Sequence, residues 1–403
     1  MAKSKTKSTS FLNLKVVPKT VITIGLASLF TDIASEGIFP ILPLFLTQVL
    51  GAGALSIGII EGFADTTSSL IRVFSGLWSD RLPTRKPLLI AGYGISSFFR
   101  PFIGLAQTWP FVLLFRFIDR VGKGLRGSPR DALIADVTTP ANRGISYGLH
   151  SAMDDAGALI GPLLVASLLY FTHLGIRNVI LLSFIPGIAA TLTLFKIKEK
   201  PAKIKNEIKK WNLVQDWRQF GSDFKWLLVA IFIFSLGNST DAFLLIQLSR
   251  VGVTPWLICI FWSALSGVKM VSSLYGGAFS DKLGRKPVII SGWLYYALIY
   301  LAFALVTQKE WVITIFLAYG IFYGLCEPSE KAFVADMTQK NLKGTAFGYY
   351  NLIISLSALP ASLLFGWVGQ TWGFPSAFAV GAALAGLAAI LLLFNKKPGK
   401  ILR

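Results

Sequence analysis

Long apolar stretches alternate with short polar segments along the whole chain. A helix that crosses a membrane needs roughly 20 mostly apolar residues, and the apolar stretches are about that long. The pattern predicts twelve spans, over residues 20–48, 54–78, 88–107, 110–135, 146–170, 178–195, 226–248, 255–279, 288–307, 311–335, 345–369 and 375–394. Because the longest polar segment is residues 196–225, we expect an all-α membrane protein with twelve transmembrane helices and no soluble domain.

The polar segments contain a sequence repeat. Gly76-x-x-x-Asp80-Arg81, followed by Arg85-Lys86-Pro87, recurs half a chain later as Gly277-x-x-x-Asp281-Lys282, followed by Arg285-Lys286-Pro287. Ala135-Asp136-x-Thr138 likewise recurs as Ala335-Asp336-x-Thr338. The chain therefore contains two copies of one unit, with the motifs in the same order. Since each unit has six spans, both have the same orientation, and we predict two parallel six-helix repeats.

The repeat also predicts the domain organisation. Residues 1–195 are expected to form an N-terminal six-helix bundle with a cytoplasmic tail, residues 196–225 a basic cytoplasmic linker, and residues 226–403 a C-terminal six-helix bundle. The linker carries Ile204, Ile208, Trp211 and Trp217 among its lysines. It could be a helix that lies on the membrane surface, or a solvated linker.

Composition and charge agree with a membrane protein. The chain is 54% hydrophobic and 15% charged, with a mean hydropathy of +0.62. Its net charge is +19. With the N-terminus in the cytoplasm, the cytoplasmic segments hold 27 Lys and Arg residues and the external loops hold 3. This bias predicts a multi-pass protein of the cell (inner) membrane with both termini cytoplasmic. The excess charge orients the chain against anionic lipid, so no nucleic-acid partner is expected.

The residues that usually carry enzyme chemistry are sparse. The chain has two cysteines, Cys259 and Cys326, which are far apart in sequence and each within an apolar span, and two isolated histidines. The sequence contains no recognisable metal-binding motif and no cluster of the residues that form a nucleophilic active site. We therefore expect neither an enzyme nor a cofactor.

Several motifs together resemble the major facilitator superfamily. The G-x-x-x-D-[RK] loop follows the second span of each repeat. In span four, Arg116-Phe117-Ile118-Asp119-Arg120-Val121-Gly122-Lys123-Gly124 is similar to another family motif, and Gly148, Gly157, Gly161 and Pro162 match a third in span five. The run from Asp119 to Ala132 resembles a branch with a charged span four. The resemblance implies a monomeric transporter in which spans 3, 6, 9 and 12 are peripheral and the other eight surround a central cavity.

Charged residues within the spans are the candidates for transport chemistry, because a charge at mid-membrane costs at least about 2.5–3.5 kcal/mol on insertion scales. Of twenty such residues, only Arg100 falls on a peripheral span. The candidates for a substrate and proton cavity are Asp32, Glu36, Glu61, Asp65, Arg72, Arg116, Asp119, Arg120, Lys123, Asp154, Asp155, Asp241, Lys269 and Glu327. The same residues could instead form static charge pairs. Glu330 and Lys331 are expected to form a local pair.

The repeated loops supply a second set of candidates. The resemblance implies that they gate the cytoplasmic side, with Asp136 and Asp336 pairing with loop Arg and Lys residues. The gating candidates are Gly76, Asp80, Arg81, Arg85, Lys86, Asp136, Gly277, Asp281, Lys282, Arg285, Lys286 and Asp336.

These patterns favour a secondary active transporter of a small polar solute that works by alternating access and is coupled to protons. A basic stripe of Arg116, Arg120 and Lys123 would bind an anionic part of an anionic or zwitterionic solute, and carboxylates on spans one, two and five would carry the proton. Three alternatives stay open. They are a transporter of metal ions or of a metal chelate such as a siderophore, a multidrug-type exporter, and a non-transporting membrane sensor.

Overall fold

The chain folds into helices that follow the predicted spans. The structure, a computed structural model, describes residues 16–79, 81–139, 142–199, 217–338 and 342–394, and no strand occurs among them. The helices are α1 (Lys19–Ile38), α2 (Leu42–Leu44), η2 (Phe45–Val49), α3 (Ala54–Ser79), α4 (Lys86–Phe99), η3 (Arg100–Leu105), α5 (Trp109–Val137), α6 (Arg143–Phe171), α7 (Ile176–Leu182), α8 (Phe184–Leu194), α10 (Ser222–Gly237), α11 (Ala242–Arg250), α12 (Pro255–Leu283), α13 (Arg285–Leu305), α14 (Lys309–Asp336), α15 (Lys343–Thr371) and α16 (Phe374–Phe394).

Some spans are formed by consecutive short helices, and local sequence explains most of these breaks. The helix α1 ends at Ile38, two residues before Pro40, and α4 ends one residue before Arg100-Pro101. A proline cannot donate a backbone hydrogen bond, and its ring clashes with the carbonyl four residues earlier. The seventh span is broken where α10 ends at Gly237 and the polar residues 238–241 precede α11. Glycine and asparagine commonly end helices.

Ten helical segments among the described residues are long and apolar enough to cross a membrane. The helices α3 and α5 are not among these ten. Both are long enough, at 26 and 29 residues, but α3 carries three charged side chains and α5 carries eight. Since charges facing lipid are costly, these two helices can lie in a membrane only when other helices cover their charged faces.

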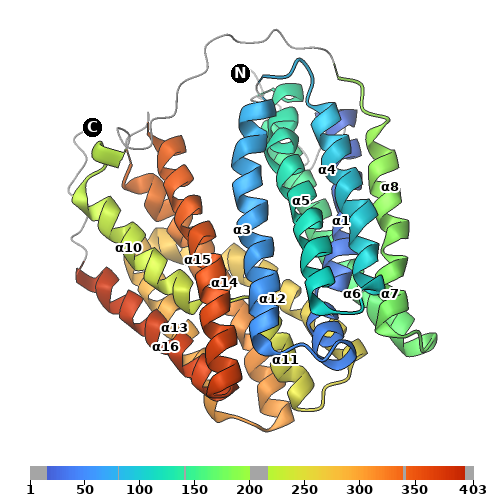
Figure 1. Ribbon diagram of the computed structural model, residues 1–403. Coiled ribbons are helices and arrows are strands. Elements are labelled where there is room, and N and C mark those ends of the chain that lie inside the picture. The colour runs from blue at the N-terminus through green and yellow to red at the C-terminus, as the bar shows by residue number, and fades with distance from the viewer. Residues whose placement is uncertain (1–15, 80, 140–141, 200–216, 339–341, 395–403) are drawn as a thin grey trace, which may run out of the picture.

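The two halves repeat the same helix packing. In the first half α1 packs on α6, and in the second α10 packs on α15. In the same way α3 packs on α5 and α12 packs on α14. Figure 1 shows the halves side by side, the first in blue to green and the second in yellow to red. The prediction of two parallel repeats therefore describes the observed architecture.

The halves contact each other mainly through α3 with α15 and α6 with α12. Glycines make the first contact close. A Cβ added at Gly58 would lie 2.2 Å from the carbonyl oxygen of Ser362, and one added at Gly366 would lie 2.8 Å from that of Ala54. The backbones of α3 and α15 therefore approach closely at Gly58 and Gly366, where a side chain on either glycine would overlap the other helix.

Two hydrogen bonds between the halves lie at the same end of the bundle, and a third joins the Thr66 hydroxyl, at the middle of α3, to the carbonyl of Ser355 at 3.2 Å. Gln48 donates to Ser249 at 2.9 Å, and the backbone N–H of Leu55 donates to the Gln370 side chain at 3.2 Å. On the second contact, the Ser263 hydroxyl donates to the carbonyl of Leu159 at 2.9 Å. In Figure 1 the halves meet at the lower end, beside α11, and lean apart toward the upper end of α3. The bundle is thus closed at one end.

The predicted linker falls largely outside the described residues, and so do Ile204, Ile208 and Trp211. Trp217 is described, and its ring lies 5.2 Å from that of Tyr349. That contact attaches the end of the linker to the second half.

Candidate functional site

A polar cavity of about 300 Å³ lies among helices of the first half. The helices α1, α3, α5 and α6 supply its walls, and its lining is dominated by charged side chains. The lining residues are Asp32, Glu36, Ser68, Ser69, Arg72, Lys123, Arg126, Gly127, Arg130, Asp154, Asp155 and Ala158. Four of them are acids and four are bases, so the lining is nearly neutral overall but locally polarised.

The acids and bases without a charged partner lie on different helices. On α1 and α6, Asp32, Glu36 and Asp155 have no cation within 4.0 Å among the described residues. On α5, Lys123 and Arg126 have no described carboxylate within that distance. Arg126 instead donates to the Ser96 hydroxyl at 3.1 Å, and its guanidinium lies 4.5 Å over the Tyr93 ring. The cavity therefore offers unpaired charge of both signs to a ligand.

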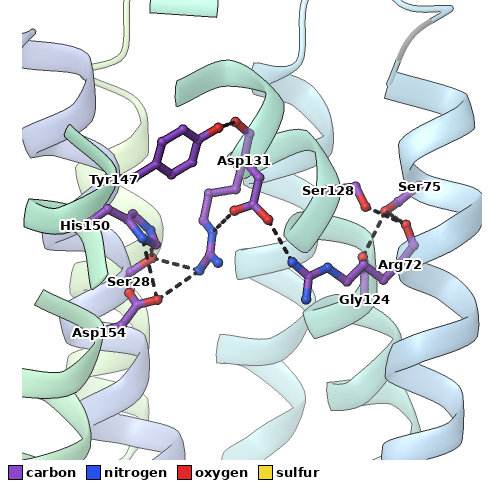
Figure 2. Close-up of polar contacts among 10 residues, drawn as sticks. Ser28, Arg72, Ser75, Gly124, Ser128, Asp131, Tyr147, His150 and Asp154 are labelled. Carbon is purple, nitrogen blue, oxygen red and sulfur yellow. Dashed lines mark hydrogen bonds and ion pairs between the residues drawn. The ribbon is translucent and has the colours of Figure 1, made fainter. Parts of the chain in front are cut away.

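The remaining charges of the cavity form a continuous network, shown in Figure 2. Arg130 lies between Asp131, at 3.1 Å, and Asp154, at 3.4 Å. Asp131 also accepts a 2.7 Å bond from Arg72 on α3. On the other side, Asp154 lies 3.7 Å from His150. This network ties α3, α5 and α6 together along one wall of the cavity.

Ser28 extends that network to two more helices. Its hydroxyl lies 2.8 Å from the Tyr93 hydroxyl on α4 and 3.1 Å from Nε2 of His150 on α6. His150 is 5% exposed, so this histidine is packed between helices. Sequence reasoning did not place Ser28 or Tyr93 in the site, because a single serine or tyrosine in an apolar span carries no distinctive pattern.

Four predicted cavity residues are buried away from the cavity instead. Arg116 lies 3.0 Å from Glu61 and 3.8 Å from Asp119, and all three side chains are at most 3% exposed. Arg120 lies 4.0 Å from the same Asp119. Arg100, from the span expected to be peripheral, donates to Asp119 at 2.9 Å. The helices α3 and α4 cover this face of α5, so these charges pair with each other and do not line the cavity.

The other predicted cavity residues are spread over both halves. Asp65 is exposed on α3 but does not line the cavity. Asp241 and Lys269 form an ion pair of 3.1 Å in the second half.

Glu327 pairs with Lys331 at 2.6 Å. The expected pair of Glu330 with Lys331 is therefore wrong. Glu330 is buried and accepts hydrogen bonds from Trp293 and Tyr350, because its position on α14 turns it toward α13 and α15.

Arg126 and Arg130 were not among the expected cavity residues, but both line the cavity. They continue the basic stripe of α5, since Arg126 and Arg130 follow Lys123 at three and seven residues, the spacing of one helix face. Helical periodicity is the signal that places them on this wall.

The repeated loops pair as expected. Arg85 donates to Asp136 at 2.9 Å and Arg285 donates to Asp336 at 3.3 Å. Arg85 also bonds Ser79, as Arg285 bonds Ser280. The two copies of the repeat thus build the same polar contact, while the gating role stays a prediction.

The other gating candidates surround these contacts. Lys86 donates to the carbonyls of Phe195 and Ile197, and Lys286 donates to that of Leu393. Asp281 pairs with Arg285 at 2.5 Å. Arg81 and Lys282 are exposed, and Gly76 and Gly277 lie within α3 and α12. Asp80 lies outside the described residues.

The first loop also has a contact that the sequence did not predict. The carboxylate of Glu199 accepts the backbone N–H groups of Arg85 and Lys86 at 2.7–2.9 Å. A carboxylate at a helix N-terminus is favourable because the first N–H groups have no partner within the helix. Glu199 therefore fixes the end of the first bundle to the start of α4.

Within the part of the chain that the structure describes, no three His, Cys, Asp or Glu residues are arranged to hold a metal ion. Cys259 and Cys326 are both buried and unpaired. The chemistry of the cavity is therefore that of ammonium, guanidinium and carboxylate groups.

Comparisons with known proteins agree on one family. The sequence model described as Major Facilitator Superfamily matches residues 24–361 and 257–402. An uncharacterised MFS-type transporter of Methanocaldococcus jannaschii is 31% identical over 393 residues, which cover 95% of this chain and 96% of that relative. The multidrug resistance protein MdtH of Salmonella newport is 23% identical over 355 residues, which cover 86% of this chain and 84% of the relative.

Solved structures share the fold. The nucleoside transporter NupG aligns with a TM-score of 0.81 at 10% identity, over 94% of this chain and 100% of that one. A bacterial homologue of the human lysosomal transporter Spinster, in an inward-facing and occupied conformation, aligns with a TM-score of 0.77 at 17% identity, over 94% of this chain and 97% of that one. The predicted all-α, twelve-helix membrane fold is confirmed, and so is the expectation of a multi-pass transporter in place of an enzyme.

Proposed function

Because the chain belongs to the Major Facilitator Superfamily, we propose that it is a secondary active transporter of a small zwitterionic or anionic solute, in the branch with a charged span four. One observation carries this proposal. The cavity presents unpaired carboxylates on α1 and α6 opposite Lys123 and Arg126 on α5. A solute with a carboxylate or phosphate on one side and an ammonium on the other matches both walls, because charge-assisted hydrogen bonds are the strong ones.

The proposed mechanism is alternating access by rocking of residues 1–195 against residues 226–403. The Lys and Arg bias puts both termini, and the loops at Arg85 and Arg285, in the cytoplasm. The α3–α15 contact then closes the external side, and the cavity faces the cytoplasm. The loop contacts of Arg85 with Asp136 and of Arg285 with Asp336 would re-form or tighten when the cytoplasmic side closes.

Proton coupling is assigned to the two aspartates of the cavity lining that lack a cation. Asp32 and Asp155 line the cavity without an ion pair, so a proton on either one does not break an ion pair. Glu61 was an earlier candidate, but it contacts Arg116 in a buried network, where gaining a proton would unpair Arg116. We therefore assign Glu61 to the static framework and Asp32 and Asp155 to the proton.

The other candidate functions fit the cavity less well. A bare metal ion would meet four bases in the lining, which favours an anionic chelate over a free cation. The relative MdtH supports a multidrug exporter as the second candidate. A hydrophobic cationic drug, however, would have to displace water from the charged side chains that line the cavity, and desolvating charged groups is costly.

The first experiment is a ligand screen by thermal shift on purified monomer, with amino acids, dicarboxylates, metal chelates and cationic drugs. The expected result is stabilisation by a zwitterion or an anion. Lys123→Ala should weaken that binding about tenfold or more, the loss of one charge-assisted hydrogen bond. Lys198→Ala, which changes an exposed lysine after α8, is the matched control. Stabilisation by cationic drugs alone would overturn the proposal.

The second experiment is uptake of the selected solute into proteoliposomes with an imposed pH gradient. The Asp32→Asn/Asp155→Asn variant should lose accumulation driven by the gradient and keep exchange of labelled for unlabelled solute. If the variant still accumulates solute, the coupling assignment is wrong. A wild-type protein that binds solute and never exchanges it would be a sensor.

A further inference from the structure

The second half holds a polar cluster that the cavity does not include. Asp241 stands at the break between α10 and α11. Its carboxylate accepts the hydroxyl of Tyr319 at 2.8 Å and that of Tyr323 at 3.1 Å, both from α14. It also pairs with Lys269 of α12 at 3.1 Å. Three spans of the second half thus converge on one carboxylate, and in the family architecture all three surround the central cavity.

Aromatic rings enclose the ammonium of Lys269. Its Nζ atom lies 3.8 Å from the centroid of the Tyr323 ring and 5.1 Å from that of Trp262. A carboxylate combined with aromatic faces is the chemistry by which proteins hold ammonium groups, because the ring faces are electron-rich. We call Asp241, Trp262, Tyr319 and Tyr323 the ammonium cage.

We propose that the ammonium cage binds the primary amine of the transported solute, and that Lys269 occupies the cage while no solute is present. This inference rests on the proposed function, because it assigns the amine to a transported solute. Lysine carries the same –NH₃⁺ group as a primary amine, on a flexible four-carbon stem that can swing away. The side chain of Lys269 is 24% exposed and that of Asp241 is 11% exposed, so the pair is not sealed in the protein interior.

The ammonium cage also contains a hydrogen-bond donor that has no acceptor among the described residues. The indole N–H of Trp262 is buried and has no hydrogen-bond partner among the described residues. A buried donor without a partner costs roughly 1–3 kcal/mol. A solute with an acceptor oxygen near its amine would satisfy this N–H while its ammonium replaces that of Lys269.

The cage also adjoins the contact between the halves. The ring of Trp262 lies 4.8 Å from that of Phe39 in the first half, and the next residue, Ser263, bonds α6. An amine that enters the cage changes the surroundings of Trp262 directly at this contact. Binding of a solute to the ammonium cage can therefore change the contact between the two halves at the closed end of the bundle.

The test uses ethylammonium chloride as a probe and measures melting temperature without any gradient or transport. In Lys269→Ala the cage is empty, and ethylammonium at about ten times its Kd should raise the melting temperature by roughly 1–2 °C. Sodium chloride of equal ionic strength should not. In Asp241→Asn/Lys269→Ala the difference between the two salts should disappear. Wild type should respond less than Lys269→Ala, because Lys269 competes for the cage.

Two results would overturn the proposal. One is an absent ethylammonium effect in Lys269→Ala, and the other is an equal effect in the double variant. If Lys269→Ala does not yield monodisperse protein, Lys269→Gln, which keeps most of the stem and removes the charge, takes its place under the same criteria. Because binding is measured at equilibrium, failure of transport in proteoliposomes would leave this result standing, and the two proposals fail separately.

Discussion

The contact between α3 and α15 allows a direct test of how the halves move, through the substitution Gly58→Ala. The added Cβ would lie 2.2 Å from the carbonyl oxygen of Ser362 and 2.9 Å from its carbonyl carbon. Both are backbone atoms, so no side-chain rotation relieves the overlap. Since ordinary contact starts at 3.4 Å, that oxygen must move 1.2 Å away from the added Cβ, which is the difference between 3.4 and 2.2 Å.

The size of the effect follows from the cost of overpacking, which is typically about 1–3 kcal/mol. A state in which α3 and α15 separate escapes this cost. The ratio of separated to closed molecules should therefore rise roughly 5- to 150-fold. A separated state populated at about 1% would reach roughly 5–60%.

The assay is the rate at which maleimide labels a cysteine within the contact. Cys259→Ser and Cys326→Ser remove the native thiols, and Ser362→Cys supplies a nearly isosteric reporter. Ser362 is 3% exposed, and its Cβ would lie 3.3 Å from a Cβ added at Gly62, so it faces α3. Gly58→Ala should speed labelling at least about fivefold.

Gly386→Ala is the matched control. Gly386 is also inside a helix, and a Cβ there meets no atom within 4 Å. Both substitutions give the same gain in helix propensity, so only the overlap differs between them. Labelling of the Gly58→Ala protein at the same rate as the Gly386→Ala protein would refute the idea that this contact opens and closes.

Two further predictions concern buried charges and are read as changes in thermal stability. Arg116→Ala leaves Glu61 buried without its cation and should cost about 3–5 kcal/mol. Lys123→Ala should cost less than about 0.5 kcal/mol, and equal losses in these two variants would mean that the buried network is not structural. Glu330→Gln keeps an acceptor oxygen for the Trp293 N–H and can donate its amide N–H to the Tyr350 hydroxyl oxygen, so it should stay within about 1 kcal/mol of wild type, whereas Glu330→Ala should lose about 1–3 kcal/mol. Equal loss in both Glu330 variants would show that the negative charge itself is required.

The number, order and approximate bounds of the membrane spans could be predicted from the sequence alone. Apolar length decides whether a helix can span a membrane, and that property is local. The repeat at Arg85 and Arg285 was equally readable, and both arginines contact the expected aspartates. Pro40 and Pro101 lie at two of the places where spans are broken into shorter helices, but the sequence analysis predicted continuous spans there, and the structure shows the breaks.

Which charges face the cavity and which pair with each other depends on how the helices pack, and the sequence alone did not predict it. Arg116 and Lys123 lie on one predicted stripe of α5, yet Arg116 is buried against Glu61 while Lys123 lines the cavity. Helical periodicity gives a side chain's direction about its own axis, but the neighbour it meets depends on where other helices cross. The same reason explains why Lys331 pairs with Glu327 and not with Glu330, and why four residues from three spans form the ammonium cage. Such contacts join residues far apart in sequence, so no local pattern records them.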